Sequence, residues 1–257
     1  MTSIFAKCAR VCVLLPLVPA VPVLAQELTM APSSHLVGDI GLGANTAPTI
    51  AHSLSSSTRA IPYANFDYGR IFARIDTFGV KLVPAGCGSL ELVTRVIGDG
   101  YTPAPAGSVA LDRRKSSVPV GLGTLQITPV GAVFLNAYRD VGKSGGNLVD
   151  LIYAAEFDVG SIALYPQAGA EYRSSAYVRY FYGVSPAEAG RSGIAAYQPR
   201  DAVNPFAGLF VEAKISGNWY LNANLRRTWL DSSVSASPLV GRRTSNSGLV
   251  ALSYRFE

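Results

Sequence analysis

The most constraining feature of the sequence is a repeated alternation of apolar and polar side chains, in segments of roughly ten residues that run from His35 to the C-terminus. The segment 147–159 is the clearest, because odd positions from Leu151 onward are apolar while Asp150, Glu156 and Asp158 lie between them. Successive side chains of a β-strand point to opposite faces, so each segment predicts a strand with one apolar and one polar face. Helical periodicity is almost absent, and the sequence therefore predicts an all-β fold.

Hydropathy narrows the choice of all-β architectures. The chain is 49% apolar and 15% charged, with a mean hydropathy of +0.24, which is high for a soluble domain. After residue 25, however, no stretch approaches the ~20 consecutive apolar residues of a membrane-spanning helix. A disordered chain and a helical membrane protein are both excluded. Two architectures remain, namely a sheet with a large buried core and a closed barrel whose outer face meets lipid.

The lengths of the connections favour the barrel. They alternate between short turns, such as 160–161 and 216–218, and long segments, such as 174–205 and 230–246. Transmembrane barrels have short periplasmic turns and longer external loops, whereas a sandwich needs no such asymmetry. Aromatic residues also gather near the ends of the apolar rows, where a membrane-interface girdle would lie: Tyr68, Trp219, Trp229, Tyr254 and Phe256. We therefore expect a closed antiparallel transmembrane β-barrel.

The pattern predicts about twelve strands. Their expected ranges are 35–44, 61–68, 70–76, 78–83, 88–97, 119–128, 131–139, 149–158, 162–173, 206–215, 218–229 and 247–256. The segment 70–83 is ambiguous, because its apolar side chains change parity near Thr77. Either a hairpin turns there or a single strand carries a bulge, so ten strands is the alternative.

The first 25 residues have the features of a secretory signal. Lys7 and Arg10 are basic, the segment 11–24 is uncharged, and Val23-Leu24-Ala25 fits a signal-peptidase site. The sequence thus predicts a cleaved signal peptide at 1–25, followed by one barrel domain at 26–257.

Residues able to perform chemistry are scarce. The only histidines of the chain are His35 and His52, so a Ser-His-acid hydrolase would have to use one of them. No spacing of histidines and acids resembles a metal site, and the net charge of +5 is not concentrated in a nucleic-acid-binding stretch. We predict no enzymatic activity, cofactor, metal or nucleic-acid partner.

Charged residues on the polar faces are expected to line the barrel interior. They either fill the lumen by pairing across strands or form a selective pore, and filling is the simpler interpretation. The predicted lumen-facing charges are Glu156, Asp158, Glu171, Arg173, Glu212, Lys214 and Arg226.

The long connection 174–205 contains a local helix signal. Ser185 and Glu188 have the spacing of a capping box, Pro186 suits the first helical position, and Gly190 is a natural stop. The sequence predicts one helical turn at about 186–189. Aromatic side chains before this turn, from Tyr177 to Tyr182, favour a loop folded over the barrel mouth, either as a packing element or as a ligand site.

The block from Tyr180 through Tyr182-Gly183-Val184-Ser185-Pro186-Ala187-Glu188-Ala189 to Pro199 resembles the signature of the MipA/OmpV family of Gram-negative outer-membrane proteins. Ser237-Pro238-Leu239-Val240 and the ending 252–256 are similar to the family's shorter motifs. The residues that carry the main signature are Tyr182, Gly183, Val184, Ser185, Pro186 and Glu188.

The resemblance implies a non-enzymatic outer-membrane scaffold that links a murein hydrolase, a lytic transglycosylase, to a murein synthase. It also implies insertion by the barrel assembly machinery into a membrane of lipid and lipopolysaccharide. Contact with lipopolysaccharide phosphates is one interpretation of the basic residues 113–115 and 242–243, and simple solvation is the other. The alternative function is an outer-membrane channel, or a surface receptor or adhesin for small solutes or host surfaces.

Overall fold

The computed structural model of the protein describes residues 34–47, 57–103 and 111–257. The predicted signal peptide at 1–25 and His52 lie outside these residues. In the described part, no helix is both long enough and apolar enough to cross a bilayer.

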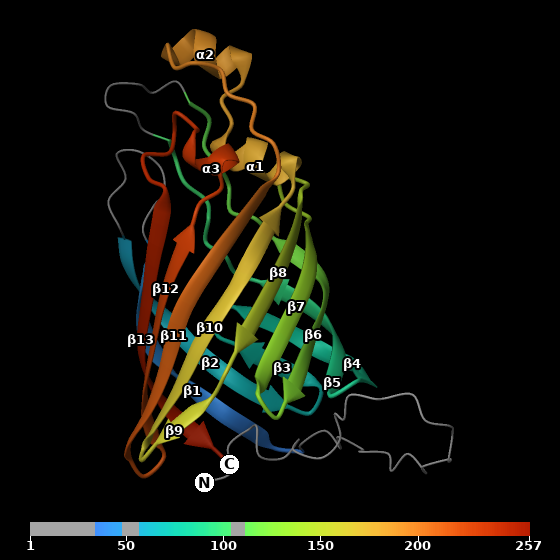
Figure 1. Ribbon diagram of the computed structural model, residues 1–257, viewed down its shortest axis with the longest axis vertical. Helices are drawn as coiled ribbons and strands as arrows, with labels where there is room; N and C mark the ends of the chain where they lie inside the picture. Colours follow the sequence, from blue (N-terminus) through green and yellow to red (C-terminus); the bar gives the residue numbers. More distant parts are fainter. Residues whose placement is uncertain (1–33, 48–56, 104–110) are drawn as a thin grey trace.

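One antiparallel sheet forms the molecule (Figure 1). Its neighbours follow the order β11-β12-β13-β1-β2-β3-β4-β5-β6-β7-β8-β10-β9, and pairing of β10 with β11 closes the barrel. The strands are β1 (Leu36–Ala47), β2 (Ser57–Tyr68), β3 (Ile71–Arg74), β4 (Thr77–Ala85), β5 (Gly88–Arg95), β6 (Pro119–Thr128), β7 (Gly131–Asp140), β8 (Asn147–Ala154), β9 (Phe157–Val159), β10 (Ile162–Arg173), β11 (Ala202–Ser216), β12 (Trp219–Trp229) and β13 (Thr244–Phe256).

The wall has twelve strands, because β9 continues β8. Both pair with β10 in a single register, in which Ala154 lies opposite Gln167 and Phe157 opposite Leu164. The predicted closed barrel of about twelve strands is therefore confirmed.

The ambiguous segment near Thr77 is a hairpin and not a bulged strand. Arg74 lies opposite Thr77, and the two residues between them form the turn. Ile75 adopts a φ of 59°, which is unusual for a β-branched residue, and its side chain packs against the cluster around Tyr63. β3 is only four residues long, which explains why its sequence signal is weak.

Burial is inverted relative to a soluble protein. Asp39, Glu91 and Asn222 are buried at 1% exposure or less, whereas Leu42 and Leu225 on the outer face are 74% and 65% exposed. Leaving large aliphatic side chains exposed around a sheet while burying carboxylates inside it is favourable only when the outer face meets hydrocarbon. The apolar rows of the sequence thus form the lipid-facing surface.

The two ends of the barrel differ. The five short turns that follow β2, β4, β6, β9 and β11 lie at the end where β1 begins and β13 ends, which we call the turn end (Figure 1). The opposite loop end carries the long connections and three helices: α1 (Ser175–Tyr182), α2 (Pro186–Ser192) and α3 (Ser232–Ser235).

Candidate functional site

The helix α1 closes the mouth of the barrel at the loop end. Tyr177, Val178 and Phe181 on this helix are at most 1% exposed. They pack in one apolar cluster with wall residues, including Phe72 and Tyr138, and with Val234 of α3 and Val240 beyond it. The expected folding of the long loop over the mouth is therefore present in the structure, and an apolar cluster forms the seal.

The capping box is formed as its sequence predicts. The Ser185 hydroxyl accepts from the Glu188 backbone N–H at 3.2 Å, and the Glu188 carboxylate accepts from the Ser185 backbone N–H at 3.0 Å. The helix extends to Ser192, three residues beyond the predicted turn, and ends at Gly193 in the left-handed conformation.

Glu188 also joins two loops. Its carboxylate pairs with Arg114 at 2.8 Å and accepts from the Asp112 backbone N–H at 3.2 Å. Burial alone would raise the pKa of this carboxyl, but the hydrogen bonds from Ser185 and the charge of Arg114 outweigh that effect and lower its pKa. Glu188 is therefore held ionised at neutral pH and ties the segment 111–118 to α2.

The two signature motifs pack on each other. Ser237 donates its hydroxyl hydrogen to the Tyr182 carbonyl at 2.6 Å, and Leu239 packs with Val184 in a small apolar cluster. Tyr182, Gly183, Val184 and Glu188 are buried, while Ser185 and Pro186 are exposed. In the described structure the signature residues thus act as packing elements of the closed mouth.

Charged side chains fill the lumen below this cap. Glu171 lies at the centre of one cluster, with Arg173 at 2.9 Å, Arg226 at 3.1 Å and Arg95 at 3.9 Å. Arg95 pairs in turn with Asp150 at 2.6 Å. Three of the predicted lumen residues, from β10 and β12, therefore come together inside the barrel, joined by two that sequence reasoning did not select.

A second cluster lies nearer the turn end. Arg255 pairs with Asp39 at 2.6 Å and with Glu212 at 2.5 Å, and Arg74 pairs with Glu91 at 2.7 Å elsewhere in the lumen. Glycines leave room for these side chains. At Gly169, for example, a Cβ would lie 2.7 Å from the ring of Phe206, on which the Arg226 guanidinium stacks at 3.9 Å.

The remaining predicted charges lie toward the turn end. Glu156 accepts from the Tyr165 hydroxyl at 3.0 Å, and Lys214 lies 5.9 Å from the Tyr220 ring. Asp158 is exposed on β9. Among the described residues, no ion pair joins Asp158 or Lys214 to the clusters around Glu171 and Arg255.

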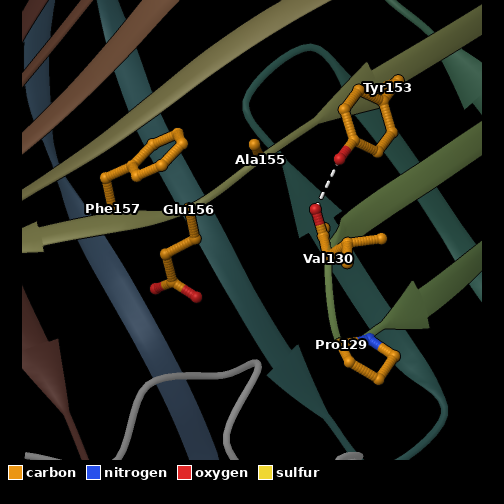
Figure 2. A pocket seen from close by; sticks show the side chains of 7 residues that line it. Pro129, Val130, Tyr153, Ala155, Glu156 and Phe157 are labelled. Carbon is orange, nitrogen blue, oxygen red and sulfur yellow. Dashed lines mark hydrogen bonds between the residues drawn. The ribbon is translucent and has the colours of Figure 1, made fainter.

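A pocket of 390 Å³ opens at the turn end (Figure 2). It lies between the β6–β7 turn and the β8–β9 strand, where Tyr153 donates its hydroxyl hydrogen to the Val130 carbonyl. Phe157 at its edge is 57% exposed, and within the described residues β9 pairs on one side only, with β10. The residues lining the pocket are Pro129, Val130, Gly131, Tyr153, Ala155, Glu156 and Phe157.

No group of three or more histidine, cysteine, aspartate or glutamate side chains suited to a metal ion occurs within the residues that the structure describes. Of the two histidines, His35 is exposed just before β1.

The sequence was compared with protein families and with known proteins. The model described as MltA-interacting protein MipA matches residues 40–256. Outer membrane protein YiaT of Escherichia coli strain K12 is 27% identical over 221 residues, which is 84% of this chain and 90% of YiaT. The MltA-interacting protein of the same strain is 29% identical over 147 residues, 57% of this chain and 59% of that protein. OmpV, an outer membrane protein of Vibrio cholerae, is 29% identical over 155 residues, 59% of this chain and 60% of OmpV. The match across nearly all of the barrel, together with its lipid-facing wall, shows that the chain belongs to the MipA family and is a β-barrel of the outer membrane.

Proposed function

We propose that this barrel is a non-enzymatic scaffold that holds a murein-processing enzyme at the periplasmic side of the outer membrane. The name of the MltA-interacting relative supports an enzyme partner of this class. By resemblance, the partners are a lytic transglycosylase and, through it, a murein synthase. The mature protein is then the single barrel domain 26–257, inserted by the barrel assembly machinery after removal of 1–25.

The observation that carries the proposal is the closure of the barrel. An apolar cluster around α1 seals the mouth, and beneath it ion pairs around Glu171 and Asp150 join β5, β8, β10 and β12 inside the barrel. A channel needs a continuous polar path, whereas a scaffold needs only a stable frame with an accessible periplasmic end. These features favour the scaffold over the alternative of a channel.

The pocket at the turn end is the proposed docking surface. Short turns place this end in the periplasm, as in other transmembrane barrels. Phe157 in the lining of the pocket offers exposed apolar area, and Glu156 beside it is acidic. We therefore expect the enzyme to present an apolar side chain flanked by basic residues.

A binding experiment tests this surface. The purified barrel in detergent is immobilised and exposed to the lytic transglycosylase of the same organism. Glu156→Lys reverses the charge in the lining of the pocket, and Asp201→Lys does the same on an exposed residue at the loop end. Binding to the wild type and the Asp201→Lys variant, with at least tenfold weaker binding to Glu156→Lys, supports the scaffold.

Two results would contradict the proposal. One is an absence of binding to the wild type combined with steady single-channel conductance in planar bilayers, which supports a pore. The other is binding that both charge reversals reduce equally, since a specific periplasmic surface does not extend to the opposite end.

A further inference from the structure

The loop end exposes many more basic than acidic side chains. Among the described residues of its loops, the exposed acids are Asp112 and Asp201. The exposed bases in the same loops are Arg113, Lys115, Lys143, Arg179, Arg191, Arg200, Arg242 and Arg243. Such an excess creates a positive potential that attracts anions to this surface.

A second pocket of 390 Å³ lies within this basic surface. It is formed where the segment 111–118 meets the turn that joins α1 to α2. Its lining combines two guanidinium groups with neutral hydrogen-bonding side chains and two acids: Asp112, Arg114, Arg179, Gly183, Val184, Ser185, Pro186, Glu188, Tyr197 and Gln198.

The two acids of the pocket already have partners. Glu188 pairs with Arg114 at 2.8 Å, and Asp112, whose side chain is 72% exposed, pairs with Arg191 at 3.2 Å. On the basic side, Arg114 is already bound to Glu188 and donates to the Gly183 carbonyl at 3.1 Å, so the available donor is Arg179. Arg179 is exposed and makes no ion pair with any residue that the structure describes.

We propose that this pocket binds a phosphate group, held by the guanidinium of Arg179. Planar guanidinium groups donate paired hydrogen bonds that match the oxygens of phosphate. The paired acids leave the positive charge of Arg179 uncompensated, and the neighbouring bases raise the local concentration of anions. The phosphate belongs either to lipopolysaccharide in the same leaflet or to a soluble phosphorylated solute. The site is independent of the scaffold function, because it lies at the opposite end of the barrel.

Calorimetric titration of the full-length barrel in detergent micelles tests the proposal. The probes are inorganic phosphate and, separately, lipopolysaccharide before and after enzymatic removal of its phosphates. We expect Arg179→Ala to weaken binding at least tenfold, since charge-assisted hydrogen bonds are lost. Arg242→Ala is the matched control, because Arg242 is equally exposed at the loop end but does not line the pocket. Heat-modifiable migration on a gel verifies that each variant is folded.

The outcomes separate the sources. Arg179-dependent binding of lipopolysaccharide that is lost with its phosphates identifies the lipid, and Arg179-dependent binding of inorganic phosphate alone identifies a soluble ligand. If neither probe binds, or if Arg179→Ala and Arg242→Ala weaken binding equally, the surface attracts anions only diffusely and the proposed site is overturned.

Discussion

Replacing Glu188 by alanine should allow the segment 111–118 to separate from α2, while the barrel stays folded. The substitution removes the carboxylate that pairs with Arg114 at 2.8 Å and accepts hydrogen bonds from the backbone N–H groups of Ser185 and Asp112. Leaving one member of a buried ion pair without its partner costs about 3–5 kcal/mol. Even the lower value of about 3 kcal/mol raises the population of the open loop about 100-fold.

Trypsin provides the assay, because the segment 111–118 contains a buried cleavage site. Arg114 is 7% exposed, so cleavage after it requires the loop to open. When opening and closing are fast, the cleavage rate follows the open population. We expect about 100-fold faster cleavage after Arg114 in Glu188→Ala, with unchanged heat-modifiable migration.

Asp112→Asn is the matched control for this experiment. It breaks the pair with Arg191, in which the Asp112 side chain is 72% exposed, and such surface pairs contribute only about 0–1 kcal/mol. If Glu188→Ala is cleaved after Arg114 no faster than Asp112→Asn, Glu188 does not hold the loops together and the reasoning is wrong.

Three further predictions concern pH, the apolar cluster at the mouth and the ion pairs in the lumen. The pKa of Glu188 in the folded protein lies below its ordinary value of 4.5, so its stabilisation is complete above that value and is lost as pH falls through the lowered pKa. Hydrogen exchange at 111–118 should therefore rise only at acidic pH, below 4.5, and a rise near neutral pH would contradict this. Tyr177→Ala combined with Phe181→Ala removes two side chains that are at most 1% exposed in the mouth. It should increase hydrogen exchange in α1, whereas Trp229→Ala on the lipid face should not, and equal exchange in both variants would argue against an apolar seal. Glu171→Ala leaves Arg173 and Arg226 without their shared carboxylate and should lower the free energy of unfolding from lipid vesicles by about 3 kcal/mol. Asp67→Asn breaks a more exposed pair with Lys81 and should lower the free energy of unfolding by less than about 1 kcal/mol. Similar losses of stability in the two variants would refute this prediction.

The strands were predictable because the two faces of a barrel wall meet different environments. Lipid on one side and a polar lumen on the other impose strict alternation, so most predicted ranges agree with the structure to within a few residues. The start of β11 was missed by four residues, since Pro205 reads as the end of a strand. Pairing of β12 with β11 begins only at Phe206, so the missing N–H of Pro205 breaks no bond of that ladder.

The helix α1 was not predicted, although its signal was present. Tyr177, Val178, Phe181 and Tyr182 have the i, i+1, i+4, i+5 spacing of an apolar helical face, and all four are buried. In a segment rich in aromatic residues this spacing is hard to separate from a loop that merely covers the mouth. The capping box of α2 was readable because its signal is local, from two side chains three residues apart.

The partners of the lumen charges were beyond sequence reasoning. Arg255 and Asp39 are 216 positions apart and meet because β13 pairs with β1 when the barrel closes. Arg95 likewise reaches Asp150 and Glu171 from the other side of the lumen. Alternation predicts which face a charge occupies, whereas the barrel diameter and stagger decide which charge it meets.

The apolar cluster at the mouth and the charged clusters below it follow one another along the barrel, and this order constrains where function can occur. A solute entering from outside would first have to displace the apolar cluster of α1 and then separate the pairs around Glu171. Breaking a single buried pair costs about 3–5 kcal/mol, and the cluster around Glu171 contains several that share residues. Transport would therefore have to overcome the interactions that keep the barrel folded. Binding at either rim leaves these interactions intact. We therefore expect the recognition surfaces at the two ends of the barrel, while the interior stabilises the fold.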